Sequence, residues 1–328
     1  MSPLLLDGLL VCPRDGAKFV PQDRDLVCQN GHAYPVVNGI PVLLREDVEA
    51  THSIAFRTHQ LLRAPVESIA SSPAGPDVDA FVQKNIGKTC GHLYAPLVGR
   101  LQSYPIPELR LEPGGARLFL EVGCNWGRWC IAAARAGYRV VGVDPSIEAL
   151  LAAQRVAQQL GVTPAFVAAD ARYLPFVASS FDVVFSYSVL QHFSKPDVAT
   201  SLSSVAQVLK PGGFSLIQLA NGHGIRSTYH RLRQMRQDDG RFKVRYWTLN
   251  EMKRVFEQRI GPSELEVDGF FSLNSQASDI DLLPSRYRLV VRSSEALRRL
   301  AKRVRWLRYF ADSLYVKSSR RALQRVGA

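Results

Sequence analysis

The 328-residue chain is 46% hydrophobic and 21% charged, as in globular proteins, and no apolar run approaches the ~20 residues of a membrane-spanning helix. Five cysteines spread along a chain whose N-terminus lacks the features of a secretory signal argue against a disulfide framework and predict a cytoplasmic protein. The whole net charge of +12 lies in residues 222–328, which hold 23 basic and 11 acidic side chains, so any polyanionic partner is expected to bind in this part of the chain.

Residues 1–48 form a small module with two cysteine-containing turns about sixteen residues apart, which is the frame of a zinc ribbon. An acid and a histidine stand where a ribbon usually has further cysteines, but carboxylate and imidazole groups both bind zinc. The alternative is a module that has lost its metal and is held together by the packing of its apolar residues. The candidate ligands are Cys12, Asp15, Cys28 and His32.

Residues 49–116 are expected to be a helical connector, with helices near 53–63 and 81–101 and a Pro- and Gly-rich loop between them. A segment that precedes a glycine turn often lies over the ligand as a lid. Asn85, His92 and Tyr94 are therefore candidates for ligand contact, with ordinary packing as the alternative.

Residues 117–328 alternate between apolar runs and amphipathic segments, which predicts a doubly wound α/β fold. A basic, mostly helical insertion separates the last two expected strands. The expected strands are 118–122, 140–143, 166–170, 181–186, 214–219, 265–271 and 312–317, and the expected helices are 129–134, 146–160, 197–209 and 249–259.

The turn after the first of these strands indicates the kind of nucleotide. Its spacing, Glu121-x-Gly123-x-x-x-Gly127, differs from the Gly-x-Gly-x-x-Gly of dinucleotide dehydrogenases, and an acid before the first glycine suits a cationic head group better than a pyrophosphate. Asp144, about twenty residues further on, is placed to accept both hydroxyls of a ribose. Asp170 ends the third strand and is placed to accept from an adenine amino group. These acids fit an adenosine with a positively charged, zwitterionic tail, and they do not fit NAD.

With Pro175-Phe176, the strand 181–184 and the turn 209–213, these residues resemble the class I S-adenosylmethionine-dependent methyltransferases, closest to the group that modifies small molecules. The resemblance covers about residues 117–220. It implies a Rossmann-like seven-stranded sheet whose last strand is antiparallel, with residues 186–190 beneath the methionine end of the cofactor. The module at 1–48 is similar to the zinc-ribbon modules that precede or partner some methyltransferases. The residues that the resemblance assigns to S-adenosyl-L-methionine are Glu121, Gly123, Cys124, Asn125, Gly127, Asp144, Asp170, Ala171 and Ser186.

Methyl transfer from a sulfonium is an in-line displacement, and it needs a base only where the acceptor must lose a proton. His192 follows the fourth strand of this domain, on the rim where the fold presents its acceptor, and is the candidate catalytic base. The alternative is that His192 orients a loop or contacts the cofactor. Tyr187, Asn221 and His223 share that rim.

The basic last third has two interpretations. Residues 294–310 have the pattern of an interfacial helix on an anionic membrane surface, and a basic cluster within 226–245 is suited to a phosphate-bearing substrate. The alternative is an ordinary amphipathic helix packed on the sheet, with a solvated basic face.

Two enzymatic functions remain open. The first is methylation at oxygen or carbon of a small or lipid-linked acceptor, such as a sugar or an isoprenoid ring, at a membrane-peripheral location. The second is an RNA methyltransferase that grips the backbone with its basic third and N-terminal module, and such binding would weaken steeply with salt. No base-flipping Asn-Pro-Pro-Tyr tetrad follows the fourth strand, which makes nucleic acid the less favoured substrate. A cofactor-binding subunit without catalysis is the third possibility.

Overall fold

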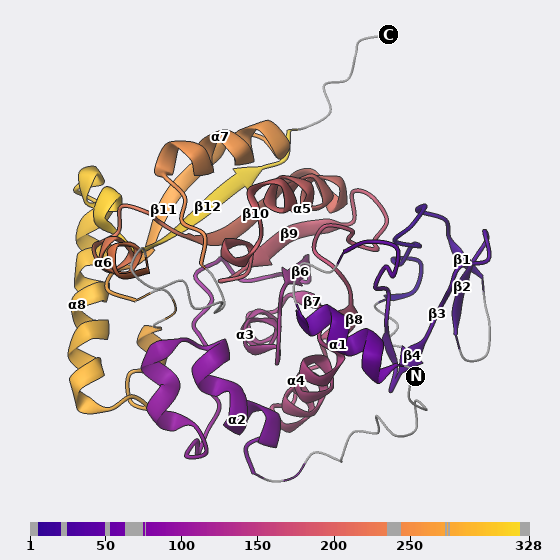
Figure 1. The fold of residues 1–328 in the computed structure, drawn as a ribbon, viewed down its shortest axis with the longest axis horizontal. Coiled ribbons are helices and arrows are strands. Elements are labelled where there is room, and N and C mark those ends of the chain that lie inside the picture. The colour runs from indigo at the N-terminus through magenta and orange to yellow at the C-terminus, as the bar shows by residue number, and fades with distance from the viewer. Residues whose placement is uncertain are drawn as a thin grey trace.

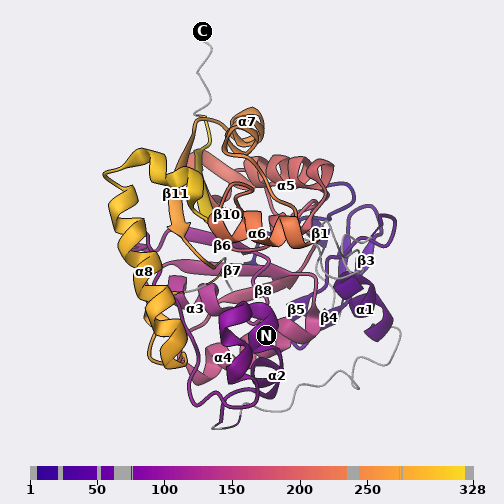
Figure 2. The same ribbon diagram turned by 60° about the vertical axis from the view of Figure 1, so that its left-hand side comes forward.

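The computed structural model describes residues 6–20, 25–49, 53–62, 75, 77–234, 244–272, 274 and 276–321. Its centre is a seven-stranded sheet with the order β11-β12-β10-β9-β6-β7-β8 (Figures 1 and 2). The strand β12 runs antiparallel to both of its neighbours, whereas the other pairings in this sheet are parallel. This topology confirms the expected Rossmann-like fold. The strands are β6 (Leu118–Val122), β7 (Arg139–Asp144), β8 (Ala165–Ala168), β9 (Phe181–Ser186), β10 (Leu209–Ala220), β11 (Ser263–Gly269) and β12 (Ser313–Ser319).

Helices cover both faces of the sheet, because successive side chains of its buried strands point to opposite sides and most are apolar. On one face, α3 (Arg128–Arg135) and α4 (Ile147–Gln159) pack against residues such as Phe119 and Phe185. On the other face, α5 (Lys195–Val208) and α7 (Leu249–Arg259) pack against residues such as Leu120 and Ile217. The sequence marks the start of α7 with a capping box between Thr248 and Glu251.

The N-terminal module lies beside the β8 edge of the sheet (Figure 1). It contains a three-stranded sheet of β1 (Phe19–Val20), β2 (Leu26–Cys28) and β3 (Ala33–Tyr34), and a hairpin of β4 (Val36–Val37) and β5 (Ile40–Pro41). Directly after β5, Val42 forms a parallel bridge with Ala168, the last residue of β8. The module therefore extends the edge of the central sheet.

The connector lies on the α3–α4 side, whereas the basic insertion lies along the β11 edge of the sheet (Figure 1). The connector contains α1 (Ser53–Leu61), α2 (Ala80–Thr89) and the short helix η3 (His92–Leu97). The indole N–H of Trp126, in the glycine turn, donates to Thr89 Oγ1 at 3.1 Å and thus ties α2 to the turn. After β10 come α6 (Ile225–Gln234) and, beyond β11, η5 (Ala277–Asp279), α8 (Ser285–Ala301) and η6 (Arg305–Phe310).

The helix expected over 294–310 differs in the structure. Helix α8 begins at Ser285, after Pro284, and ends at Ala301, and residues 305–310 form the separate turn η6. The break lies at Val304, whose φ of −106° and ψ of 85° are not helical. Within the described part of the chain, no helix is both long and apolar enough to span a membrane.

Candidate cofactor site

The glycine turn between β6 and α3 is held in an unusual backbone conformation. Gly123, Asn125 and Gly127 have φ angles of 79°, 48° and 78°, in the left-handed region that glycine adopts without strain. A Cβ atom added to Gly123 would stand 2.3 Å from Val189 Cγ2. The rim loop after β9 therefore packs directly on the turn, and only glycine fits at position 123.

Asp144, at the end of β7, holds the turn from beneath. Its Oδ2 accepts the backbone N–H of Asn125 and its Oδ1 accepts the backbone N–H of Ser146, each at 2.9 Å. Burial of the carboxyl raises its pKa to about 6. A carboxylate oxygen accepts two hydrogen bonds, so each oxygen retains one acceptor position for a hydroxyl of a bound ribose.

Glu121 is a buried acid with an unmet hydrogen-bonding capacity. Its side chain is 2% exposed, and its Oε2 has no hydrogen-bond partner among the described residues. Burial raises the pKa of Glu121 to about 8, so the isolated site favours the neutral acid at pH 7. A cationic ligand group placed at Oε2 would satisfy this oxygen and favour its ionised form.

Cys124 and Ser186 form hydrogen bonds that hold the turn against the neighbouring strands. The N–H groups of Gly123 and Cys124 both donate to the carbonyl of Val143, at 2.7 and 2.9 Å. The Cys124 thiol is buried against Gly142, where an added Cβ would stand 2.9 Å from Sγ. The Ser186 hydroxyl donates to the Val122 carbonyl at 2.8 Å and thereby links the ends of β9 and β6.

Asp170 and Ala171 lie just beyond β8, beside the end of β7. Asp170 forms an ion pair with Arg172 at 2.8 Å, and Arg172 also reaches Asp197 at 3.1 Å. The sequence indicated the acid but not its partner, although Arg172 stands only two residues away. An adenine amino group at Asp170 would share this carboxylate with a guanidinium.

The acceptor rim follows β9. His192 is half-buried at the end of the short helix η4 (Leu190–His192), and its main-chain carbonyl accepts from the Arg245 guanidinium. Tyr187, also on this rim, donates its hydroxyl to Asp268 at 2.8 Å. Asp268 is the penultimate residue of β11 and lies at the same edge of the sheet. It is 6% exposed and accepts from Ser313 at 2.6 Å. Burial raises the pKa of Asp268. Asp268 is not among the candidates predicted from the sequence, although an acid near the end of an expected strand is a usable signal.

A buried ion pair lies behind the turn. The Arg128 guanidinium, on the first residue of α3, pairs with Asp279 of η5 at 2.9 Å, and the two side chains are 7% and 1% exposed. The Tyr94 hydroxyl donates to the same Asp279 oxygen. Tyr94 is thus part of a structural network that joins η3, α3 and η5. No sequence pattern connects these residues, because Arg128 and Asp279 are 151 positions apart.

The structure gives the other candidates surroundings or partners of their own. His92 is exposed, the Asn85 amide donates to Phe81 O within its own helix at 2.9 Å, and Asn221 bonds to the main chain of η6. The four candidate metal ligands gather on the N-terminal module, apart from this site. They are considered below.

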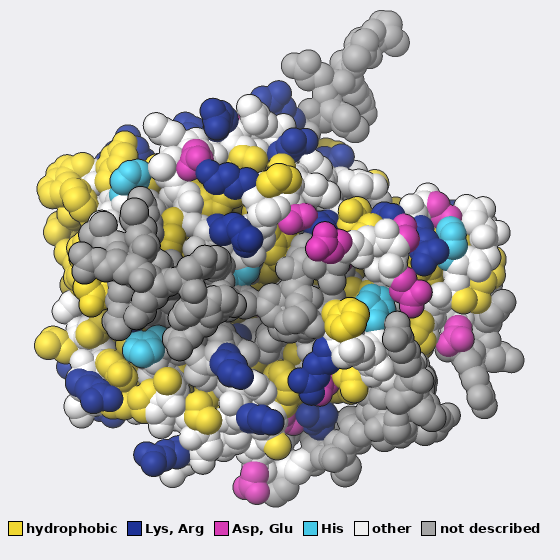
Figure 3. Space-filling view, in the orientation of Figure 1, with side chains coloured by type: hydrophobic (Ala, Val, Ile, Leu, Met, Phe, Trp, Pro, Cys, Tyr) yellow, Lys and Arg dark blue, Asp and Glu magenta, His cyan; other side chains and the backbone are white. Residues whose placement is uncertain are grey.

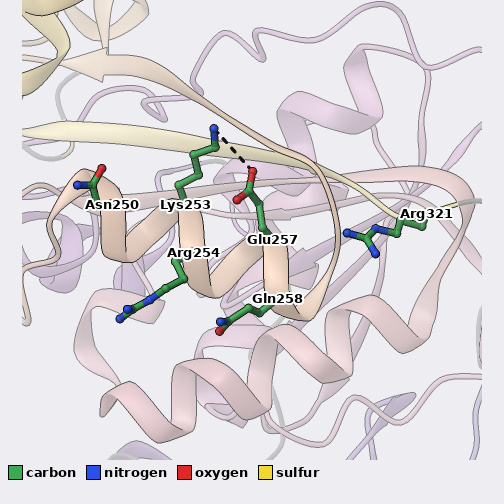
Figure 4. A pocket seen from close by; sticks show the side chains of 6 residues that line it. All are labelled: Asn250, Lys253, Arg254, Glu257, Gln258 and Arg321. Carbon is green, nitrogen blue, oxygen red and sulfur yellow. Dashed lines mark ion pairs between the residues drawn. The ribbon is translucent and has the colours of Figure 1, made fainter.

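A shallow pocket of about 570 Å³ lies along the outer side of α7 (Figure 4). Lys253 and Glu257, one helical turn apart, form an ion pair there at 3.7 Å. Arg321 follows the end of β12, which runs antiparallel to β10, so this end of the pocket lies at the sheet edge opposite the glycine turn. The pocket is therefore not part of the cofactor site. Its lining residues are Asn250, Lys253, Arg254, Glu257, Gln258 and Arg321.

Comparisons with known proteins place the turn and the strands around it in one family. Residues 119–213 match the family model described as "Methyltransferase domain". A ubiquinone biosynthesis O-methyltransferase of Brucella anthropi is 34% identical over 107 residues, which are 33% of this chain and 42% of that protein. A probable fatty acid methyltransferase of Mycobacterium tuberculosis is 31% identical over 121 residues, which are 37% of this chain and 28% of that protein. The match thus spans less than half the length of either relative.

Among solved structures, the chain is similar to phosphoethanolamine N-methyltransferase 2 of Haemonchus contortus in complex with phosphomonomethylethanolamine and S-adenosylhomocysteine. The TM-score is 0.41 at 21% identity, over 64% of this chain and 50% of that one. The sequence matches and the strand order together lead to one conclusion: the chain carries a class I S-adenosylmethionine-dependent methyltransferase domain.

Proposed function

We propose that this protein transfers a methyl group from S-adenosylmethionine to an acceptor that is presented at an anionic lipid surface. The cofactor supplies an electrophilic methyl group on a sulfonium. In this assignment, Asp144 accepts the ribose hydroxyls through its two remaining acceptor positions, and Glu121 Oε2 accepts from the ammonium group of the methionine end. Asp170 and the Ala171 backbone hold the adenine edge. The buried Oε2 without a partner among the described residues supports a cationic ligand at this place.

His192 is the proposed general base for a hydroxyl acceptor. It lies three residues beyond Val189, which packs on Gly123, so the loop that carries the histidine is positioned by the cofactor turn. A hydroxyl must lose its proton as the new bond forms, and a neutral imidazole is suited to accept it near pH 7. A carbon acceptor that is already nucleophilic would need no base.

The observation that carries the acceptor class is an exposed apolar surface beside the rim. We call this surface the rim patch. It combines the first turns of α6 with η6, and its side chains are between 47% and 60% exposed. The Asn221 amide, at the end of β10, donates to the carbonyls of Tyr309 and Ala311 at 2.9 and 2.8 Å, which fixes η6 next to the end of the sheet. Figure 3 shows hydrophobic side chains gathered over this region, at the upper left. The rim patch consists of Ile225, Tyr229, Trp306, Tyr309 and Phe310.

Basic side chains flank the rim patch. Lys302, Arg303 and Arg305 are exposed between the end of α8 and η6. Aromatic side chains that enter a bilayer interface, with cations around them that meet anionic head groups, are the pattern of a peripheral membrane site. An acceptor with a lipid tail would then reach the rim from the membrane surface, with its reactive head toward His192.

The names of two relatives support an apolar acceptor, since one acts in ubiquinone biosynthesis and the other is a probable fatty acid methyltransferase. The RNA alternative rests on the same basic residues, so the two must be separated by experiment. Aromatic side chains at a bilayer contribute through apolar burial, whereas binding to an RNA backbone depends mainly on charge.

Vesicle co-sedimentation tests the proposal. The wild-type protein should bind vesicles of phosphatidylcholine and phosphatidylglycerol, and binding should fall at least about tenfold in the double variant Trp306→Ala/Phe310→Ala. Leu289→Ala is the matched control, because Leu289 is 70% exposed near the start of α8, outside the rim patch. Calorimetric binding of S-adenosylmethionine should be the same in all three proteins.

Two outcomes would count against an acceptor at a lipid surface. Equal vesicle binding by the wild type and the double variant would remove the lipid surface from the proposal. Tight, salt-sensitive binding of a structured RNA that the double variant retains would instead favour RNA as substrate. Labelled methyl transfer to a lipid extract, rather than to water-soluble extract or RNA, then identifies the acceptor class directly.

A further inference from the structure

The N-terminal module brings four metal-binding side chains together around one point. Cys12 Sγ and Cys28 Sγ each lie 3.5 Å from His32 Nδ1, and Asp15 Oδ2 lies 3.1 Å from the same nitrogen. One ligand atom from each of the four residues lies within 4.8 Å of every other. Both cysteines are buried, at 1% and 2% exposure.

Two tight backbone turns produce this convergence. Gly16 and Gly31 have φ angles of 73° and 82°, and their N–H groups donate to the carbonyls of Cys12 and Cys28 at 2.8 and 2.9 Å. The turns point their ligands toward each other across the small sheet. The Asp15 carboxylate is oriented by the Ala17 N–H and the Asn30 amide, each at 2.9 Å, so it is held in place by groups outside the cluster.

The distances fit a tetrahedral ion. Metal–sulfur and metal–nitrogen bonds of about 2.3 and 2.0 Å at tetrahedral angles separate the sulfur from the nitrogen by about 3.5 Å, and the nitrogen from an oxygen by about 3.3 Å. The observed separations are 3.5 and 3.1 Å. Two thiolates, an imidazole and a carboxylate are the donors that a zinc-type divalent cation prefers.

We propose that Cys12, Asp15, Cys28 and His32 bind one zinc-type divalent cation that holds the N-terminal module in the shape in which it packs against the cofactor domain. Four protein ligands complete the coordination, so the ion is structural and does not act on a substrate. Asp15 stands where a typical zinc ribbon has a cysteine, so one soft thiolate donor is replaced by a harder carboxylate oxygen.

The N-terminal module contacts the region of the cofactor site through main-chain hydrogen bonds at the edge of the central sheet. After the hairpin, Leu43 N–H donates to the Ala168 carbonyl at 2.8 Å, two residues before Asp170. A second strip joins the same region, where Val11 N–H donates to Pro175 O at 3.0 Å and Val177 N–H donates to Leu9 O at 2.9 Å. The turn that carries Cys12 is therefore continuous with residues that support the adenine end. This coupling rests on the cofactor assignment proposed above, whereas the metal site itself does not.

Metal analysis of the purified full-length protein tests the site. We expect one zinc per chain in the wild type, and Co²⁺ substitution should give thiolate-to-cobalt charge-transfer bands and the d–d absorption of a tetrahedral centre. The zinc should be lost in Cys28→Ser and in Asp15→Ala. Cys90→Ser, the same change at another buried cysteine, should keep the metal. Asp15→Cys should bind zinc and show stronger charge-transfer bands in its cobalt form, because it adds a thiolate.

A wild-type protein without stoichiometric metal after growth with zinc, or an unchanged metal content in both Cys28→Ser and Asp15→Ala, would overturn the metal site. The Asp15 variants guard against misfolding, because Asp15 is exposed whereas Cys28 is buried.

Removal of the metal with a chelator tests whether the ion affects cofactor binding. Metal-stripped protein should keep its helical circular dichroism but bind S-adenosylmethionine at least about tenfold more weakly, and zinc should restore the affinity. Unchanged affinity in folded, metal-free protein would overturn the coupling while leaving the metal site intact. If neither form binds S-adenosylmethionine, the cofactor assignment fails, and the metal content still decides the site.

Discussion

The backbone N–H of Asn125 donates to Asp144 Oδ2 at 2.9 Å and so joins the glycine turn after β6 to the acid that ends β7. Asn125 has a positive φ of 48°, which is unfavourable for most residues with a side chain, and this hydrogen bond helps to hold it there. Asp144 thus shapes the turn in the free protein. In the cofactor site that we propose, it would also accept the hydroxyls of the ribose.

Replacement of Glu121 by Gln should stabilise the protein at high pH. The pKa of Glu121 is about 8 in the folded protein and near 4.5 for an unperturbed Glu, so folding holds a proton that the unfolded chain loses. Stability therefore falls as pH rises from about 4.5 to about 8. The free-energy difference between Glu121→Gln and wild type should grow over this range, to a few kcal/mol, in urea unfolding at pH 5 to 9.

Glu264→Gln is the control for this series, since Glu264 is exposed on β11. Its difference from wild type should stay constant with pH. A constant difference for Glu121→Gln as well would show that Glu121 does not titrate in the folded state as described.

Cofactor binding should release protons from Glu121. An ammonium group at Oε2 lowers the pKa of this acid, so binding of S-adenosylmethionine at pH 7 should expel up to one proton per site. Calorimetry in two buffers with different ionisation enthalpies measures that proton. Glu121→Gln should abolish the release and weaken binding, although the same variant is the more stable protein. Equal proton release by both proteins would disconnect Glu121 from the ligand.

The buried pair of Arg128 and Asp279 should be costly to break. Asp279→Asn leaves a guanidinium buried without its counter-ion, and we expect a loss of about 3–5 kcal/mol in the free energy of unfolding. The double variant Arg128→Met/Asp279→Leu should recover much of this loss, because it removes both charges. Glu257→Gln, which breaks the surface pair with Lys253, should cost at most about 1 kcal/mol. A similar cost for both single variants would contradict the structural role given to Arg128.

His192→Ala should lower kcat by about 10²–10⁴ for a hydroxyl acceptor and leave the affinity for S-adenosylmethionine unchanged. The acid limb of the pH–rate profile should disappear with it. Tyr187→Phe, on the same rim, removes a hydroxyl that donates to Asp268 and should mainly reduce stability. Full turnover of His192→Ala at neutral pH would show that His192 is not the base.

The sequence predicted elements well where their signals are local. Strand β6 and helix α7 begin and end at the expected residues, because a glycine ends the first and a Thr–Glu capping box and Gly261 bound the second. The predicted helix over 294–310 was wrong in its extent. The helical spacing of its apolar residues continues across Val304, but the helical conformation of the backbone ends before that residue.

The long-range contacts could not be predicted. The pairing of Val42 with Ala168 and the ion pair of Arg128 with Asp279 join segments more than a hundred residues apart, and no periodicity encodes such partners. The ion pair between Asp170 and Arg172 joins residues that are close in sequence. The position of Asp170 after an expected strand predicts a ligand contact, but it does not predict this ion pair. The sequence therefore indicated which residues could form the cofactor site, whereas the supports of that site required the fold.

Calorimetric titration of S-adenosylmethionine into the wild type and Asp144→Ala measures the cofactor site itself. We expect one binding site per chain in the wild type. We expect an affinity at least about 100-fold weaker in Asp144→Ala, because the variant loses two hydrogen bonds to a carboxylate and the support of Asn125. Absence of binding to the wild type, or equal affinity in the two proteins, would show that Asp144 and the glycine turn do not form an S-adenosylmethionine site.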